Sequence, residues 1–102
     1  MYLQIFDLGG RRAVVTGGAQ GIGAACADAL AEAGARIVIA DLDLPAATAK
    51  AEAMRAAGRQ AQAVALDVTD SAAVEALAES LEAGGGVDIL INNAGRSIRR
   101  GI

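Results

Sequence analysis

Short apolar runs alternate along the chain with longer stretches that are rich in alanine. The apolar runs occupy residues 13–16, 36–40, 61–66 and 87–91. Within each run, apolar and polar residues show little alternation, which is typical of parallel strands that are buried on both faces. We therefore predict four parallel strands.

The stretches between these runs begin and end with residues that favour helix termini. The first covers about 21–33 and is followed by a glycine, and the second starts near Pro45 and ends near Gly58. The third follows 69–71, whose hydroxyl and carboxylate groups can cap a helix, and stops at the glycines 84–86. The order β-α-β-α-β-α-β predicts an α/β fold with a parallel sheet, right-handed crossovers and helices on both faces.

A glycine-rich segment joins the first predicted strand to the first predicted helix. Its glycines, Gly17, Gly21 and Gly23, have the spacing G-x-x-x-G-x-G, which differs from both G-x-G-x-x-G and the P-loop. Glycine lets the backbone turn tightly and approach a pyrophosphate, and a helix N-terminus offers free N–H groups to it. The segment indicates a nucleotide phosphate site, with a purely structural turn as the alternative.

Asp41 ends the second apolar run, 18 positions after Gly23. This is near the offset of about 20 residues at which dinucleotide-binding folds place an acid that binds the adenosine ribose. A carboxylate there would repel a 2′-phosphate, and the neighbouring Gln20 and Leu42 offer no cation, so the sequence favours NAD over NADP. The alternative is an exposed aspartate at a strand end. Asp43 is more simply explained as the N-cap of the helix at Pro45.

The third apolar run is followed by Asp67 and Val68. In an open parallel sheet, ligands bind beyond the carboxyl ends of the strands. Asp67 could accept a hydrogen bond from an adenine amino group, and Val68 could pack on the ring. We expect both residues to lie in the same site as the glycine-rich segment.

The fourth apolar run is followed by Asn92-Asn93-Ala94-Gly95. Asn93, Ala94 and Gly95 offer polar backbone near the cofactor ribose. The Asn92 amide could contact the ligand, or it could tie the central strands together. Both interpretations of Asn92 are open at this point.

Composition narrows the possible functions. The chain has 102 residues, 54% of them hydrophobic, a formal net charge of −3 and no histidine. These values argue against nucleic acid and membrane partners, and they exclude histidine-ligated metal sites and histidine-dependent nucleophiles. Cys26 is the only cysteine, which we expect to be a small buried hydrophobe. A cytoplasmic location is expected, and the basic residues Arg96, Arg99 and Arg100 are interpreted as a solvated cluster.

Taken together, these motifs resemble the short-chain dehydrogenase/reductase family over about residues 9–98. Thr16 to Gly23 matches the family's T-G-x-x-x-G-x-G loop, and Asn92 to Gly95 matches its N-N-A-G segment. The resemblance implies a Rossmann-type sheet of strand order 3-2-1-4, a nicotinamide cofactor, preferably NAD, and alcohol–carbonyl oxidoreduction. The chain is similar to members of the family that act on sugars, polyols or secondary alcohols. By position, it implies cofactor contacts from Gly17, Gln20, Gly21, Ile22, Gly23, Asp41, Leu42, Asp67, Val68, Asn93, Ala94 and Gly95.

Catalysis in this family uses a serine, a tyrosine and a lysine, together with an asparagine. No set in this chain matches them, since Tyr2 precedes the first strand and Lys50 lies in a predicted helix. We therefore expect residues 1–102 to form a single partial cofactor-binding domain with no catalytic residue and no metal, from a parent enzyme that is homo-oligomeric. The last strand, 87–91, is expected to leave an exposed apolar edge that favours self-association. A non-catalytic dinucleotide-binding or interaction module is the alternative.

Overall fold

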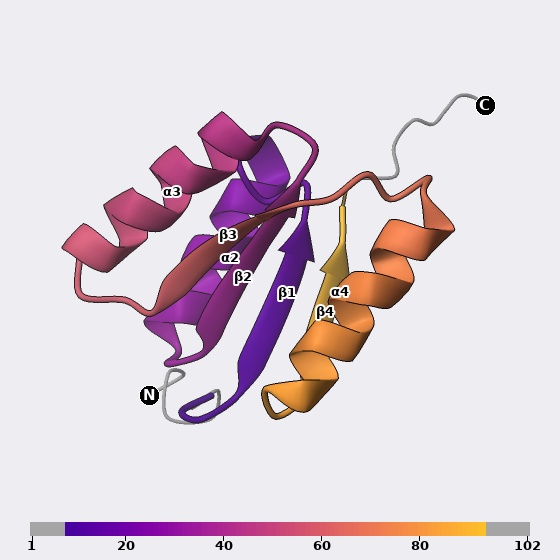
Figure 1. The fold of residues 1–102 in the computed structure, drawn as a ribbon. Coiled ribbons are helices and arrows are strands. Elements are labelled where there is room, and N and C mark those ends of the chain that lie inside the picture. Colours follow the sequence, from indigo (N-terminus) through magenta and orange to yellow (C-terminus); the bar gives the residue numbers. More distant parts are fainter. Residues whose placement is uncertain (1–7, 94–102) are drawn as a thin grey trace.

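The computed structural model describes residues 8–93, and it contains all the strands and helices predicted between them (Figure 1). The chain alternates strictly between strand and helix, as the hydrophobic pattern predicts. In chain order the elements are β1 (Arg12–Thr16), α2 (Gly21–Glu32), β2 (Arg36–Asp41), α3 (Leu44–Ala56), β3 (Ala61–Ala65), α4 (Ser71–Ala83) and β4 (Ile89–Asn92).

The strands form one parallel sheet of order β3-β2-β1-β4, which is the order implied by the family resemblance. The register places Thr16 of β1 beside Ala40 of β2 and Asn92 of β4. Because all the strands run in the same direction, their carboxyl ends meet at one edge of the sheet. The segments that follow β1, β2, β3 and β4 are therefore brought to this edge (Figure 1).

Strands β1 and β2 are buried on both faces, as their lack of alternation between apolar and polar residues predicts. In β3 and β4, at the edges of the described sheet, exposed residues stand among half-buried ones, so the prediction that these two strands are buried on both faces is wrong. One face of the core contains Val15, Ile37 and Ile39, packed against α2 and α3. The opposite face contains Val14 and Val38, packed against Leu66 and Leu81, with α4 over it. The helices pack through small side chains that allow close approach to the sheet, namely Ala27, Ala31, Ala47 and Ala51. Cys26 in α2 is only half-buried, so the expectation of a buried side chain there is wrong.

Two aspartates cap helices through their side chains. Asp43 accepts a hydrogen bond from the backbone N–H of Ala46 at 3.1 Å, which confirms its predicted role at the start of α3. Asp70 accepts one from the N–H of Ala73 at 3.2 Å and is the N-cap of α4, so Ser71 is the first helical residue and not the cap. These bonds satisfy N–H groups that have no partner inside the helix.

Strand β4 begins at Ile89, two residues later than predicted. The Asp88 carboxylate accepts a hydrogen bond from the backbone N–H of Arg12 at 2.9 Å, so a side chain takes the place of a strand partner there. Val87 and Leu90 are 41% and 63% exposed, which confirms the predicted apolar surface at this end of the sheet. Within the described range, no helix has the length and apolar character needed to cross a membrane.

Candidate functional site

A hollow of about 420 Å³ lies at the carboxyl edge of the sheet. It collects residues from segments that follow each of the four strands, although these segments are distant in sequence. Seven of the residues singled out from the sequence line it: Gly17, Gln20, Asp41, Leu42, Asp67, Val68 and Asn93. Leu66 and Thr69 complete the lining.

The glycine-rich segment leaves the N-terminus of α2 uncovered. Gly17 and Gly21 have φ angles of 64° and 60°, in the left-handed region that favours glycine. Gln20 is the N-cap, and its side chain makes no capping hydrogen bond. A side chain added at Gly21 would meet nothing within 4 Å, so space is open beside the first turn. The free N–H groups and the positive end of the helix dipole can therefore receive an anion.

Gly23 has a different role from that of Gly21. It is buried, and an added Cβ would overlap the Gly17 carbonyl oxygen and approach Asn93 Nδ2 to 2.8 Å. Glycine is thus needed here for packing between helix and loop. Gly21, Ile22 and Gly23 do not line the hollow, and the side chain of Ile22 is 76% exposed.

The Asp41 carboxylate connects the end of β2 to the glycine-rich segment. Its Oδ2 accepts a hydrogen bond from the backbone N–H of Ala19 at 3.2 Å, and its Oδ1 accepts one from the N–H of Asp43 at 3.0 Å. The side chain is half-buried and lines the hollow, next to the exposed Leu42. No Lys or Arg of the described segment lines this hollow, so the carboxylate meets no counter-ion in it.

Asp67 is held in a tight turn by Thr69. Its Oδ1 accepts a hydrogen bond from the Thr69 hydroxyl at 2.6 Å and another from the Thr69 N–H at 2.9 Å. These two bonds hold the pKa of the exposed Asp67 carboxyl below its ordinary value, and the bond from the hydroxyl has the larger effect. Asp67 therefore presents a carboxylate to the hollow, beside the half-buried Val68.

Thr16 joins the end of β1 to the end of β4. Its hydroxyl lies 3.1 Å from Asn92 Oδ1 and 3.3 Å from the carbonyl of Ile91, and it accepts a hydrogen bond from the N–H of Asn93 at 2.9 Å. Asn93 Nδ2 in turn donates to the carbonyl of Gly17 at 3.2 Å. Asn92 thus ties β4 to β1, while Asn93 lies against the glycine-rich segment and lines the hollow. Ala94 and Gly95 lie outside the described residues.

Three participants were not singled out as site residues from the sequence. The sequence places Thr16 only in the loop motif, and Thr69 only among the helix-cap residues. The apolar run predicts Leu66 as the last residue of a strand, whereas β3 ends at Ala65 and Leu66 turns into the hollow lining. The one available signal was position, because each of these residues stands at the carboxyl end of a strand.

Other chemistry has little support in the part of the chain that is described. No group of three or more His, Cys, Asp or Glu side chains there is placed to hold a metal ion. Lys50, the only lysine of the chain, pairs with Asp28 at 2.7 Å between α3 and α2. As its predicted position in a helix suggested, Lys50 lies outside the lining of the hollow.

Sequence comparison finds relatives throughout this part of the chain. The short chain dehydrogenase family model matches residues 11–102. Sorbitol dehydrogenase of Cereibacter sphaeroides is 49% identical over 88 residues, and galactitol 2-dehydrogenase of Agrobacterium fabrum is 47% identical over 88 residues. Each match covers 85% of this chain and 33% of the relative, so the chain spans about a third of the length of these proteins.

Structural comparison agrees with the sequence matches. The crystal structure of gox2181 superposes with a TM-score of 0.87 at 48% identity, covering 96% of this chain and 38% of that one. The Pseudomonas aeruginosa RhlG/NADP active-site complex superposes with a TM-score of 0.81 at 43% identity, covering 90% of this chain and 37% of that one. The Rossmann-type order of the strands is therefore shared with experimentally determined structures.

Proposed function

Because the chain belongs to the short chain dehydrogenase family, we propose that it forms the cofactor-binding part of an oxidoreductase that transfers hydride between a nicotinamide dinucleotide and an alcohol or carbonyl substrate. The observation that carries the proposal is the single hollow that joins the ends of all four strands. A purely structural turn at the glycine-rich segment would not require polar side chains from β2, β3 and β4 to meet it.

The residues of the hollow fit the parts of a dinucleotide. The uncovered N-terminus of α2, with open space beside Gly21, suits the pyrophosphate. Asp41 and Leu42 suit the adenosine ribose, and Asp67 and Val68 suit the adenine. Asn93 lies on the opposite side of the glycine-rich segment and suits the ribose nearer the nicotinamide, where we also place Ala94 and Gly95. When bound, the nicotinamide ring supplies or accepts the hydride.

The preference proposed for NAD rests on Asp41. Its carboxylate can accept hydrogen bonds from the ribose hydroxyls, and it would repel a 2′-phosphate that no cation in the described lining neutralises. RhlG, a related structure, is an NADP complex, so relatives with the same strand order bind the phosphorylated cofactor. We therefore propose that the side chains at the end of β2, and not the fold, decide between NAD and NADP in this chain.

The substrate class proposed is a polyol or another secondary alcohol. Two relatives near 50% identity are dehydrogenases of sorbitol and galactitol. Lys50 is engaged by Asp28 and lies outside the hollow, and Tyr2 lies outside the described residues. We propose that residues 1–102 bind the dinucleotide without oxidising an alcohol when they are tested alone.

Calorimetric titration with NAD and with NADP tests the site directly. NAD should bind at least about tenfold more tightly than NADP, the ratio expected for about 1.4 kcal/mol of repulsion at the 2′-position. Equal affinities, or tighter binding of NADP, would contradict the role given to Asp41. Absence of binding by either dinucleotide would contradict the proposed function. Binding together with oxidation of sorbitol by the same chain would contradict the division between binding and catalysis.

A further inference from the structure

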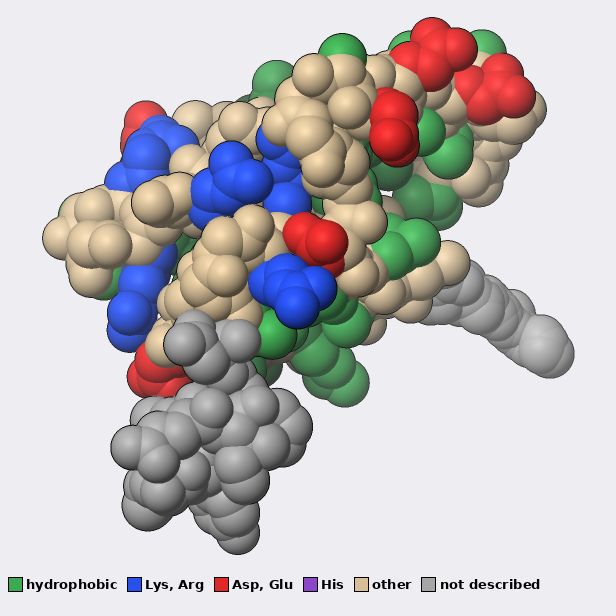
Figure 2. Space-filling model, turned by 90° about the horizontal axis from the view of Figure 1, so that it is seen from below, with side chains coloured by type: hydrophobic (Ala, Val, Ile, Leu, Met, Phe, Trp, Pro, Cys, Tyr) green, Lys and Arg blue, Asp and Glu red, His purple; other side chains and the backbone are tan. Residues whose placement is uncertain are grey.

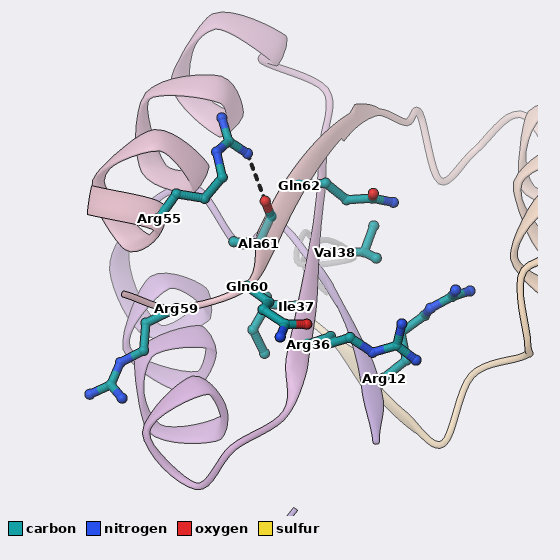
Figure 3. Close-up of a pocket in the computed structure, with 9 residues that line it drawn as sticks. All are labelled: Arg12, Arg36, Ile37, Val38, Arg55, Arg59, Gln60, Ala61 and Gln62. Atoms are coloured by element: carbon teal, nitrogen blue, oxygen red, sulfur yellow. Dashed lines mark hydrogen bonds between the residues drawn. The ribbon is translucent and has the colours of Figure 1, made fainter. Parts of the chain in front are cut away.

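A second hollow lies at the opposite edge of the sheet, where the strands begin. It measures about 410 Å³ and is lined by four arginines, Arg12, Arg36, Arg55 and Arg59, together with the amides of Gln60 and Gln62 (Figure 3). No carboxylate between residues 8 and 93 belongs to its lining. From the geometry and charge of this hollow, we infer a binding site for a small polyphosphate, distinct from the dinucleotide site.

The cations of the described segment are concentrated at this end. Five of its six Lys and Arg side chains are placed near the starts of β1, β2 and β3, and only Lys50 stands apart. Figure 2, which faces this end, shows Lys and Arg gathered over its left and central part, whereas carboxylates dominate the upper right. The positive side chains are therefore concentrated at one end of a chain whose net charge is −3. This concentration creates a local positive potential that attracts anions.

Two of the four arginines have a structural explanation. Arg12 donates to the carbonyls of Leu81 and Gly84 at 2.9 and 2.7 Å, at the C-terminus of α4. Arg55 donates to the carbonyl of Ala61 at 2.6 Å (Figure 3). Each guanidinium has five N–H donors, so donors remain after these bonds. The same bonds hold both side chains at the rim of the hollow.

Arg36 and Arg59 have no such explanation. Both are exposed, and neither side chain makes a hydrogen bond or ion pair with any residue between 8 and 93. Arg36 is also the register partner of Arg12 on the neighbouring parallel strand, and the two side chains extend toward the same side (Figure 3). Like charges at paired positions destabilise a sheet, and a bound anion would remove that cost.

The shape and the donors define the ligand. A volume near 410 Å³ suits a small molecule better than the flat surface of a folded partner. Guanidinium groups bind phosphate oxygens through paired hydrogen bonds, and the Gln60 and Gln62 amides add neutral donors. The guanidinium groups do not converge on one point: those of Arg12 and Arg36 lie near each other, whereas that of Arg59 points away from them (Figure 3). A chain of two or three linked phosphates can reach more than one of these separated groups, and a single phosphate cannot. A free polyphosphate and the phosphates of a nucleoside triphosphate share this chemistry.

Titration of the full chain with tripolyphosphate, orthophosphate and ATP tests the inference. The double variant Arg36→Gln/Arg59→Gln removes the two arginines that have no structural bond. Arg11→Gln is the matched control, because Arg11 is exposed at the same end, pairs with Asp88 at 4.0 Å and does not line the hollow. Tripolyphosphate should bind more tightly than orthophosphate, and the double variant should lose at least about tenfold in affinity while Arg11→Gln changes less than about twofold.

The outcomes separate the alternatives. Equal losses in the double variant and in Arg11→Gln would show diffuse attraction by surface charge and overturn the site. Competition between tripolyphosphate and NAD would place the anion in the dinucleotide hollow and would also overturn the proposed site. Tighter binding of a polyglutamate peptide than of tripolyphosphate would overturn the site too. If ATP binds as tightly as tripolyphosphate, the ligand is a nucleotide, and if it binds more weakly, the ligand is a free polyphosphate. Either result supports the site even if NAD does not bind.

Discussion

The carboxylate of Asp41 at the end of β2 accepts a hydrogen bond from the backbone N–H of Ala19, 22 positions earlier in the chain. This bond holds the glycine-rich segment against β2 before any ligand is present. One side chain therefore orders the loop and also faces the hollow where the ribose is proposed to bind. Removing it should affect both functions.

We expect Asp41→Ala to weaken NAD binding by about tenfold or more, since it removes charge-assisted hydrogen bonds worth about 1.5–3 kcal/mol. NADP binding should weaken less, because the repulsion of its 2′-phosphate is also removed, so the NAD/NADP ratio should fall. Calorimetry with both dinucleotides measures the ratio. Asp43→Ala is the control: Asp43 carries the same charge two residues after Asp41, but it caps α3 and does not line the hollow. An equal fall of the NAD/NADP ratio in Asp43→Ala would contradict a specific role for Asp41.

Replacing Gly23 should abolish dinucleotide binding, whereas replacing a remote glycine should not. An added methyl group at Gly23 overlaps the Gly17 carbonyl, so we expect a loss of about 1–3 kcal/mol in the free energy of unfolding and loss of dinucleotide binding. Gly58→Ala is the comparison, because Gly58 has a φ of 89° and open space around it, and should cost about 1–2 kcal/mol from backbone strain alone. Urea unfolding and NAD titration of both variants distinguish the two effects; normal NAD binding by Gly23→Ala would refute the packing argument.

Thr16→Val tests the connection between β1 and β4. The change preserves the shape of the buried side chain but removes the hydroxyl that contacts Asn92 and the N–H of Asn93. We expect a loss of about 1–3 kcal/mol in unfolding free energy, because polar groups lose their partner, and a weaker NAD affinity as Asn93 shifts. Ser80→Ala on the exposed surface of α4 should change neither quantity. Unchanged stability in Thr16→Val would mean that the hydroxyl is dispensable.

The pKa of Asp67 should respond to Thr69. The Thr69 hydroxyl and N–H hold this pKa below its ordinary value, so Asp67 contributes stability that is complete above the ordinary carboxyl pKa. That contribution is lost as the pH falls through the lowered value of the folded state. In Thr69→Val the hydroxyl bond is absent and the pKa should rise toward normal, as followed by NMR titration of the carboxyl carbon. Thr48→Val in α3 is the control, and an unchanged Asp67 titration in Thr69→Val would exclude the hydroxyl as its main cause.

The exposed β4 surface should promote self-association of the 102-residue chain. Leu90 is 63% exposed and borders an apolar hollow of about 360 Å³ between β4 and α4. A charged residue there makes pairing of such surfaces unfavourable, so Leu90→Arg should shift the chain toward the monomer in sedimentation experiments. Leu42→Arg is the comparison, because Leu42 is similarly exposed at 74% but lies after β2 and not on an edge strand. A wild-type chain that is already monomeric would contradict the prediction.

The order of the elements and the positions of the motifs were predictable from local sequence patterns. The lack of alternation in the runs at β1 and β2 indicated that these strands are buried on both faces, because that pattern depends on local spacing. The position of Asp43 before Pro45 indicated a helix cap, because capping depends on local hydrogen bonding. The residues of the hollow were predictable for a similar reason, since parallel strands must bring their carboxyl ends to one edge. The strand order itself came from the family resemblance and was confirmed by the structure.

How the predicted residues divide their roles depends on their contacts in the folded chain. Gly21 opens space while Gly23 packs against Gly17, and Asn92 ties strands while Asn93 faces the hollow. Spacing alone cannot tell apart residues of the same type that lie close together in the sequence, because their difference lies in tertiary contacts: Gly23 meets Gly17 and Asn93, whereas Asn92 and Asn93 meet Thr16 and Gly17. The arginine-lined hollow is invisible in the sequence for the same reason. Its cations come from β1, β2 and the end of α3, and only the register of the sheet brings them together.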